Sequence, residues 1–207
     1  IKTKEVLSKF KLIKKIKIFY LKKNKGAGYC RNLAINKSRA SYIAFIDSDD
    51  LWHKNKLKFQ INFMKKNKYN FTYTDYKTFK KNSPKKNNIK TPKKFNFESF
   101  IKNTSIATST MVIKKSIVKG VKFTNTKICE DYYFKCQLLK KISYAYCCPG
   151  YLACYQIRKN SLQSNRLRNL CWMWKINNKF NNFSVLKNLI CIFFISINSF
   201  KKYGFRH

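Results

Sequence analysis

Acidic residues are scarce in this chain of 207 residues, which has 8 Asp and Glu against 46 Lys and Arg and a formal net charge of +38. Histidine is scarcer still, with only His53 and His207, and no two cysteines have the C-x-x-C spacing. These absences argue against a structural zinc site, which is built from closely spaced Cys and His ligands. They also argue against triad hydrolysis, because no Ser or Cys nucleophile stands in a recognisable setting.

Long apolar segments are missing as well. The most apolar stretch, 189–195, lies within 185–200 and is flanked by Lys187, Lys201 and Lys202. It is shorter than the roughly 20 residues that a helix needs to cross a bilayer. We expect 185–200 to form a helix that lies in a membrane interface or packs on a partner, with a core helix as the alternative.

Glycine and proline are few, at 5 and 3, whereas aromatic residues are abundant, with 18 Phe, 13 Tyr and 3 Trp. With 44% hydrophobic residues, this composition indicates a folded protein of one domain, or of one domain with an appendage. The 8 cysteines fit small buried hydrophobes in a reducing compartment better than a disulfide framework. No signal peptide is visible, and the chain opens on Ile1 and not on Met, which suggests a fragment.

The large positive charge is typical of nucleic-acid-binding proteins. However, Lys, Asn, Ile, Phe and Tyr are inflated together, as an AT-rich coding sequence would favour, and the lysines are dispersed along the whole chain. We therefore predict no nucleic-acid partner and keep a basic nucleic-acid binder as an alternative. An anionic membrane surface is favoured instead, because each lysine near such a surface gains about 1 kcal/mol.

Helical and strand patterns alternate along the chain, which predicts an α/β fold. The predicted helices cover 1–15, the segment from the glycine-rich stretch 24–28 to 38, then 55–66, 97–102, 130–141 and most of the chain from 162. The predicted strands cover 16–21, 42–46, 71–75, 109–113, 144–147 and 151–155. Residues 77–96 are polar, basic and interrupted by proline, which indicates a loop or flap.

The acidic residues that do occur are clustered, and the first cluster is Asp47-Ser48-Asp49-Asp50. It directly follows the apolar run 42–46, a predicted buried strand whose carboxyl end is where open α/β sheets bind ligands. Mg²⁺ and Mn²⁺ prefer such oxygen ligands, usually alongside substrate phosphates. Because adjacent carboxylates repel one another without a cation, we favour a metal site over an acidic helix cap.

The second cluster, Glu130-Asp131, stands at a predicted helix start. A carboxylate there could act as a general base and take a proton from a reacting hydroxyl. The alternative is a first-turn acid that interacts with the helix dipole.

These motifs together resemble the family 2 glycosyltransferases, which have the GT-A fold. The sequence reads N-K-G-A-G-Y-C-R-N at 24–32, Y-I-A-F-I-D-S-D-D-L-W at 42–52 and K-L-K-F-Q at 56–60. The corresponding family pattern is N-x-G-x-x-x-A-R-N, Y-I-A-F-L-D-S-D-D-x-W and K-L-x-x-Q. Glu130-Asp131 falls where the family has an E-D motif, so the resemblance covers most of 1–165.

The resemblance implies an inverting transfer of a sugar from a nucleotide-diphosphate donor, with a UDP-sugar favoured. In this reading, Asp49 and Asp50 hold Mg²⁺ or Mn²⁺ and the ribose, with Asp47 in support. The acceptor would be a cell-surface polysaccharide or a lipid-linked glycan. The protein would then be cytoplasmic and peripheral on the inner face of the membrane.

For the remaining motif residues, the resemblance implies that Asp131 is the general base and Glu130 its neighbour. Asn24, Gly26 and Arg31, together with the first acidic cluster, would line the nucleotide side. An arginine suits a diphosphate, although it could also tie the loop to the sheet.

Family members begin with strands that lie ahead of the helix resembled by residues 1–10. We therefore expect a GT-A domain over 1–160 that is incomplete at its amino end, followed by a helical extension over 161–207. One alternative to an active enzyme is a catalytically inactive remnant that serves as a binding or scaffold protein.

Overall fold

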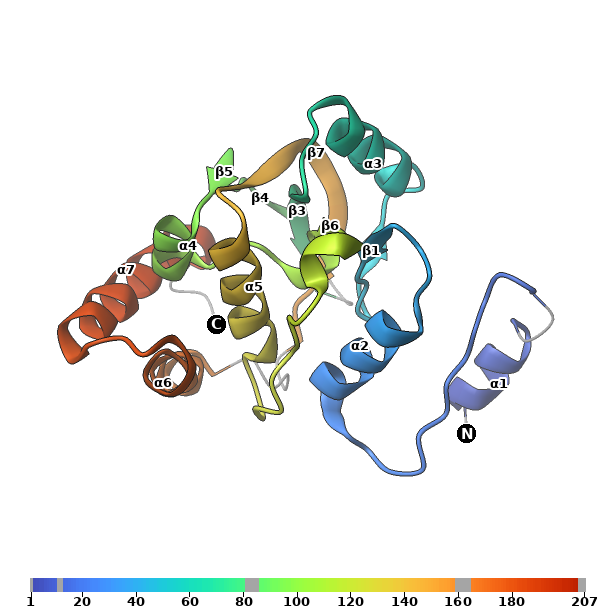
Figure 1. Cartoon of the computed structure of the whole chain (residues 1–207), viewed down its shortest axis with the longest axis horizontal. Coiled ribbons are helices and arrows are strands. Elements are labelled where there is room, and N and C mark those ends of the chain that lie inside the picture. The colour runs from blue at the N-terminus through green and yellow to red at the C-terminus, as the bar shows by residue number, and fades with distance from the viewer. Residues whose placement is uncertain (1, 11–12, 81–85, 159–164, 205–207) are drawn as a thin grey trace.

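A mixed β-sheet flanked by helices forms the centre of the molecule in a computed structural model, which describes residues 2–10, 13–80, 86–158 and 165–204 (Figure 1). Five strands follow the order β1-β6-β3-β7-β2, while β4 pairs with β3 and β5 with β7. The β3–β7 pair is parallel and the other strand pairs are antiparallel. The strands are β1 Tyr42–Ala44, β2 Leu51–Trp52, β3 Phe71–Phe79, β4 Lys86–Ile89, β5 Lys94–Phe95, β6 Val112–Lys114 and β7 Ala145–Gln156. This sheet confirms the predicted α/β class.

Helices surround the sheet, and Figure 1 shows α4 to α7 gathered at one side of it, with α1 set apart beyond α2. The α-helices are α1 Lys2–Ser8, α2 Gly26–Lys37, α3 Lys56–Lys66, α4 Phe97–Asn103, α5 Glu130–Lys141, α6 Arg166–Ile176 and α7 Val185–Tyr203. Short helical turns are η1 Thr108–Thr110, η2 Lys115–Val118 and the π-helical η3 Asn177–Asn181.

Strand β3 is central and longer than the predicted strand at 71–75. Its first six residues are all buried, as expected for a strand covered on both faces. The ladder with β7 continues to Phe79, which lies opposite Gln156. The prediction ended too early because it gave weight to the polar Lys77, whereas backbone pairing decides where this strand ends.

Residues 77–96 do not form a simple loop, so that prediction was wrong. Beyond the end of β3, residues 86–89 form β4 against β3, and 94–95 form β5 against β7. Only Ile89 of β4 is buried. A strand with three exposed polar residues at a sheet edge carries little apolar pattern, and for this reason its sequence resembles a loop. Residues 81–85 lie outside the described residues.

The two strands predicted at 144–147 and 151–155 are one strand, β7. Its register against β3 shifts where Thr74 faces Cys148 and Asp75 faces Tyr151. Pro149 and Gly150, the latter at φ +109°, occupy the irregular step between these pairs. The sequence signal for a turn therefore marks a bulge within a continuous strand.

Four other predicted elements also differ. The helix predicted over 1–15 ends at Ser8. Residues 16–21 form no strand, because no described strand pairs with them. The strand predicted at 109–113 is divided into η1 and the later β6, and the strand at 42–46 ends at Ala44. The predicted helix start at 162 lies outside the described residues, and α6 begins at Arg166.

An aromatic cluster joins the end of β1 to α5. Phe45 packs edge-on against Phe123 and Phe134, with ring centroids 5.4 Å and 5.8 Å away. Phe123 and Phe134 stack on each other at 3.9 Å. Such pairs add about 0.5–1.5 kcal/mol beyond their area burial. The cluster therefore fixes the chain that follows β1 against the first turns of α5.

The C-terminal helices pack into the same core as the sheet. Ile176 of α6 and Cys191 of α7 are buried in the main apolar cluster. Tyr132 of α5 donates a hydrogen bond of 2.9 Å to the buried side chain of Asn177. Among the described residues, no helix has the length and apolarity needed to cross a membrane.

Candidate active site

The two acidic clusters meet in one cavity of about 1240 Å³, between the chain after β1 and the start of α5. The aromatic cluster described above holds these two segments together. Carboxylates and one bridging arginine line one part of the cavity, and they are Asp47, Asp49, Asp50, Glu130, Asp131 and Arg31. Side chains of α6 and α7, including Leu170 and Phe200, line another part.

Arg31 of α2 joins the two clusters directly. Its Nη2 atom lies 2.6 Å from Oδ1 of Asp47, and its Nη1 atom lies 2.7 Å from Oε1 of Glu130. The side chain of Arg31 is only 15% exposed. Although burial opposes the cation, the surrounding carboxylates raise the pKa of Arg31, so it stays charged. The arginine thus connects the motif of α2 with both acidic motifs.

A glycine allows α2 to approach this site closely. Gly28 is buried, and a Cβ atom there would lie 2.7 Å from the carbonyl oxygen of Thr124 and 3.1 Å from Cγ of Glu130. No side chain larger than hydrogen fits this contact without a shift. Gly28 therefore sets the distance between Arg31 and the E-D motif.

Asp50 is the most buried residue of the first cluster, at 6% exposure. Its Oδ1 atom accepts a hydrogen bond of 3.0 Å from the backbone amide of Gln156. Its Oδ2 atom is buried and has no hydrogen-bond partner among the described residues. Burial is the main cause that raises the pKa of Asp50. An unsatisfied carboxylate oxygen of this kind can accept a cation or a donor from a ligand.

Asp49 is more accessible and pairs with Arg158, whose Nε atom lies 3.0 Å from Oδ2. Because the Arg158 side chain is 56% exposed, this ion pair is readily exchanged for another partner. No three His, Cys, Asp or Glu side chains of the described residues gather into a metal site. One or two carboxylates nevertheless suffice for Mg²⁺ when substrate phosphates supply further oxygens. Asp49 and the free oxygen of Asp50 fit that arrangement.

Asp131 is held by two donors on one oxygen. Thr108 Oγ1 donates to Oδ2 of Asp131 at 2.7 Å, and Lys135 Nζ donates to the same atom at 2.6 Å. Burial alone would raise the pKa of Asp131, but the Lys135 ammonium, the Thr108 hydroxyl and the Arg31 charge lower it well below its usual range. Asp131 is therefore ionised at neutral pH.

Glu130 behaves differently from its neighbour. Burial and the charge of Asp131 raise the pKa of Glu130, while the contact with Arg31 opposes this rise. Adjacent carboxylates with pKa values shifted apart are typical of functional sites.

Two of the predicted site residues lie elsewhere. Asn24 is exposed and uses its Oδ1 atom to accept the amide of Gly26 at 2.9 Å. Gly26 has φ +81°, a backbone conformation that favours glycine. Neither residue lines the cavity, so their visible contribution is the turn that begins α2.

Sequence reasoning missed Thr108, Lys135 and Arg158. Lys135 could have been found, because a lysine four residues after Asp131 on a helix faces the same side. Thr108 and Arg158 come from distant segments, and no local pattern marks them.

The K-L-x-x-Q motif forms a buried support next to the site. Lys56 donates a hydrogen bond to Gln60 at 2.9 Å and lies 4.3 Å from the ring centroid of Trp52. Gln60 in turn donates to Thr72 and to the carbonyl oxygen of Thr110. Burial lowers the pKa of Lys56 to about 7. Trp52 does not line the cavity.

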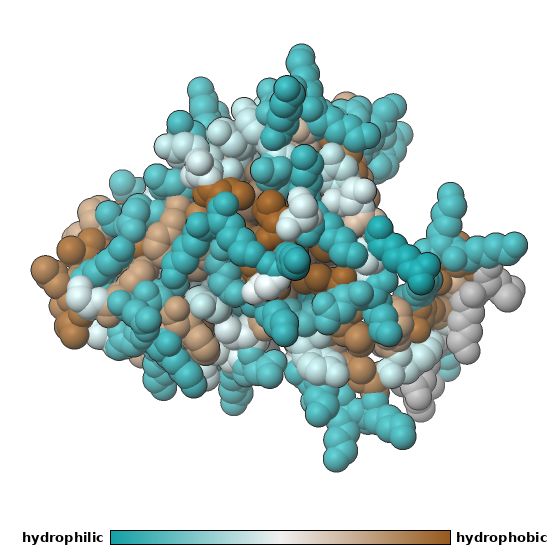
Figure 2. Space-filling view, viewed as in Figure 1, coloured by the Kyte–Doolittle hydropathy of each residue, from teal (hydrophilic) through white to brown (hydrophobic). Residues whose placement is uncertain are grey.

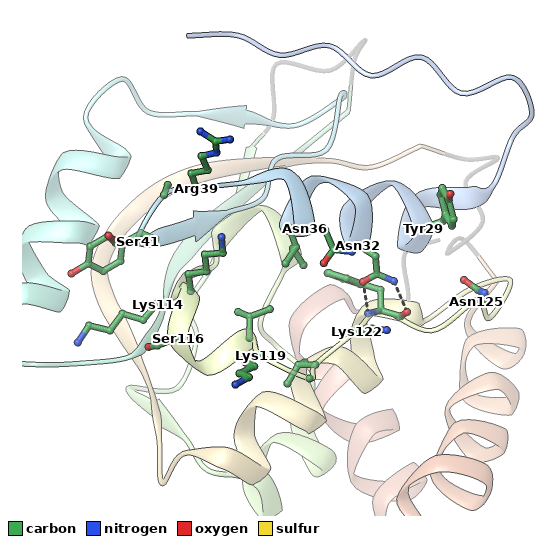
Figure 3. Close-up of a pocket in the computed structure, with 18 residues that line it drawn as sticks. Tyr29, Asn32, Asn36, Arg39, Ser41, Lys114, Ser116, Lys119, Lys122 and Asn125 are labelled. Atoms are coloured by element: carbon green, nitrogen blue, oxygen red, sulfur yellow. Dashed lines mark hydrogen bonds between the residues drawn. The ribbon is translucent and has the colours of Figure 1, made fainter.

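A second cavity of about 1190 Å³ lies between α2 and residues 114–125 (Figure 3). Its lining includes several cations and no carboxylate; the cations are Arg39, Lys114, Lys115, Lys119 and Lys122. Without an acidic group it offers neither a metal ligand nor a carboxylate base. The cavity that holds the two acidic clusters is therefore the candidate active site.

Comparison with known proteins places this arrangement in a family. The family model described as "Glycosyl transferase family 2" matches residues 2–151, and the chain therefore belongs to this family. The resemblance inferred from the motifs is thereby confirmed. Membership also identifies the chain as a glycosyltransferase.

Two curated glycosyltransferases are similar to this chain over most of its length. The chain is 29% identical over 202 residues to the "Putative teichuronic acid biosynthesis glycosyltransferase TuaG" of Bacillus subtilis (strain 168), covering 97% of this chain and 80% of TuaG. It is 31% identical over 163 residues to the Escherichia coli "UDP-Glc:alpha-D-GlcNAc-diphosphoundecaprenol beta-1,3-glucosyltransferase WfgD". This match covers 78% of this chain and 64% of WfgD.

Among solved structures, the fold is similar to that of S. aureus TarS 1-349 in complex with UDP-GlcNAc. The TM-score is 0.69 at 16% identity, and the match covers 97% of this chain and 61% of the TarS chain. This likeness confirms the GT-A fold. The chain thus spans less than two thirds of the TarS chain that it matches.

Proposed function

We propose that the cavity around Arg31 transfers a sugar from a nucleotide-diphosphate donor, most simply a UDP-sugar, to a glycan acceptor. The observation that carries this proposal is the convergence of Asp47 and Glu130 on one arginine, since it joins the two acidic motifs in a single site. The donor class is supported by the names of TarS in complex with UDP-GlcNAc and of WfgD as a UDP-Glc enzyme.

On this proposal, Asp49 and Asp50 hold Mg²⁺ or Mn²⁺ beside the donor diphosphate. The bound cation would neutralise negative charge that grows on the leaving diphosphate. The unpaired Oδ2 atom of Asp50 and the exchangeable pair of Asp49 with Arg158 support this assignment. Arg158 also lines the cavity, as does Lys127, so both add positive charge where a diphosphate would lie.

Asp131 acts as the general base in this reaction. The acceptor oxygen attacks the anomeric carbon of the donor while Asp131 takes the hydroxyl proton. The bond from that carbon to the diphosphate oxygen breaks, and the nucleoside diphosphate leaves with the electron pair. A single displacement of this kind inverts the configuration at the carbon. The ionised state of Asp131 supports its assignment.

The acceptor is a lipid-linked or cell-surface glycan on this proposal, and the protein works at the cytoplasmic face of a membrane. The name of WfgD describes a diphosphoundecaprenol acceptor. Helix α7 exposes one apolar stripe in which Leu186 is 68% exposed, Leu189 54% and Phe193 61%. Figure 2 shows apolar surface at the end of the molecule where Figure 1 places α7. With its flanking lysines, α7 would lie in the membrane interface with this stripe turned toward the lipid.

A transfer assay with UDP-sugars and a lipid-linked glycan tests this function. Turnover should require Mg²⁺ or Mn²⁺ and should stop when EDTA removes the metal. Asp131→Asn should lower kcat by about 10²–10⁴-fold because the base is lost, with donor binding retained in calorimetry. Asp49→Asn should weaken metal-dependent donor binding.

Glu98→Gln is the matched control, since it removes an exposed carboxylate on α4 that pairs with Lys187 and does not line the cavity. It should leave turnover unchanged. A chain without metal-dependent nucleotide binding would instead be a catalytically silent binding protein. Tight binding to nucleic acid with a steep salt dependence would indicate a basic nucleic-acid binder.

A further inference from the structure

Asp131 has two oxygens in different environments. Both of its described hydrogen bonds fall on Oδ2, from Thr108 on η1 and from Lys135 one helical turn further along α5. No described residue donates a hydrogen bond to Oδ1. The Lys135 side chain is 4% exposed, whereas that of Asp131 is 19% exposed and lines the cavity. One oxygen is thus anchored, and the carboxylate can offer the other.

Charged groups from three helices surround this carboxylate. Arg31 approaches from α2, and Glu130 precedes it on α5. Lys202 of α7 lines the same cavity, and burial together with the charge of Lys135 lowers the pKa of Lys202 to about 8. The Cys129 thiol is adjacent, and burial together with the two carboxylates raises its pKa to about 12, so it stays neutral. Lys135 is the cation nearest to Asp131 at 2.6 Å.

We propose that Lys135 and Thr108 are positioning residues that hold Oδ2 of Asp131 so that Oδ1 faces the acceptor hydroxyl. This inference rests on the proposed function, because it assigns Asp131 the role of base. Two anchors from different elements fix the rotation of the carboxylate, which is a condition for efficient proton transfer. The buried ammonium also keeps the base ionised in the apolar surroundings that burial creates.

The charge of Lys135 gives a test through pH. Removing an adjacent opposite charge raises the pKa of a carboxyl, by about 1–3 units for partners this close. In Lys135→Met, Asp131 should therefore take up a proton at higher pH. This rise has to be followed on the Asp131 carboxyl itself, because the raised pKa values of Glu130 and Asp50 determine the acid limb of turnover. Lys141→Met removes an exposed lysine from the same helix and should leave the pKa of Asp131 unchanged.

Thr108 provides an uncharged counterpart with a nearly isosteric change. Thr108→Val deletes the donor and should lower kcat more than it changes KM, whereas Thr108→Ser keeps the hydroxyl and should restore kcat. A merely structural threonine would give equal losses in both variants or none. Equal kcat values for Thr108→Val and the parent protein would overturn its part in the proposal.

NMR titration of the Asp131 carboxyl carbon provides a readout that needs no turnover. An unchanged Asp131 pKa in folded Lys135→Met, with an active parent protein, would overturn the inference alone. A raised pKa in that variant supports the arrangement even if the parent shows no transfer. In that case the proposed function is wrong, but the electrostatic effect of Lys135 on Asp131 is confirmed.

Discussion

Arg31 is the residue on which the geometry of the site depends most. Its two nitrogens reach carboxylates from segments that are 16 and 99 positions away in the chain. Both partners are held mainly by this contact, since Asp47 and Glu130 have their described ion pairs with Arg31 alone. A planar guanidinium can serve two carboxylates at once, which an ammonium on a flexible stem does poorly.

Replacing Arg31 should therefore destabilise the protein and disable the site. Arg31→Met leaves two partly buried carboxylates without their cation, which should reduce the free energy of unfolding by about 3 kcal/mol. Arg31→Lys should recover only part of this loss. Urea denaturation followed by circular dichroism measures the change. A loss below about 0.5 kcal/mol in Arg31→Met would show that the contact is loose in solution.

At the scale of elements, the approach of α2 to the start of α5 defines the site, and Gly28 permits it. Gly28→Ala should cost about 1–3 kcal/mol, because the new methyl group overlaps the carbonyl oxygen of Thr124. It should also lower transferase activity by moving Glu130 away from Arg31. Thermal unfolding and the transfer assay measure the two effects.

Gly26→Ala serves as the comparison for that change. Gly26 has open space around the position of a Cβ atom but a φ of +81°, so only backbone strain of about 1 kcal/mol is expected. A Gly26→Ala variant less stable than Gly28→Ala would contradict the close-contact explanation.

The sequence predicted elements well where a local pattern and a tertiary role coincide. The α5 helix begins at Glu130 as predicted. Helix α2 was also predicted, although it begins at Gly26, within the glycine-rich stretch and not after it. Elements that depend on a distant partner were misjudged. Strand β4 exists because β3 lies beside it, and β7 stays continuous because β3 pairs on both sides of its bulge.

The same contrast holds within the site. The carboxylates were identified because three acidic residues in four positions are unusual in so basic a chain. Arg158 was not identified, because it is one of 46 basic residues and no local pattern marks it as a partner of Asp49. Pairing between distant segments is set by the packing of the whole chain, and a single sequence does not record it.

At the scale of the whole molecule, the proposed membrane contact combines the apolar stripe of α7 with the dispersed positive charge. Leu189→Ser combined with Phe193→Ser should weaken binding to vesicles with anionic lipids by at least about tenfold, because both exposed side chains would enter the interface. Sedimentation with the vesicles at two salt concentrations measures the apolar and electrostatic contributions separately.

The matched control for that variant lies on α3. Leu57 and Phe59 are 39% and 51% exposed, so Leu57→Ser with Phe59→Ser removes the same residue types from another surface. This control should bind vesicles as the parent protein does. Equal losses in the two double variants would refute a specific role for α7.

The bridge between Arg31 and Glu130 also has a consequence for biosynthesis. Because its two ends are 99 positions apart, no site exists on a ribosome-bound nascent chain until α5 has left the exit tunnel. Until then Arg31 cannot link the aspartates after β1 to α5. Long-range contacts of this kind slow folding. During a translational pause before residue 130, the nascent chain would therefore carry the first acidic motif without a complete site.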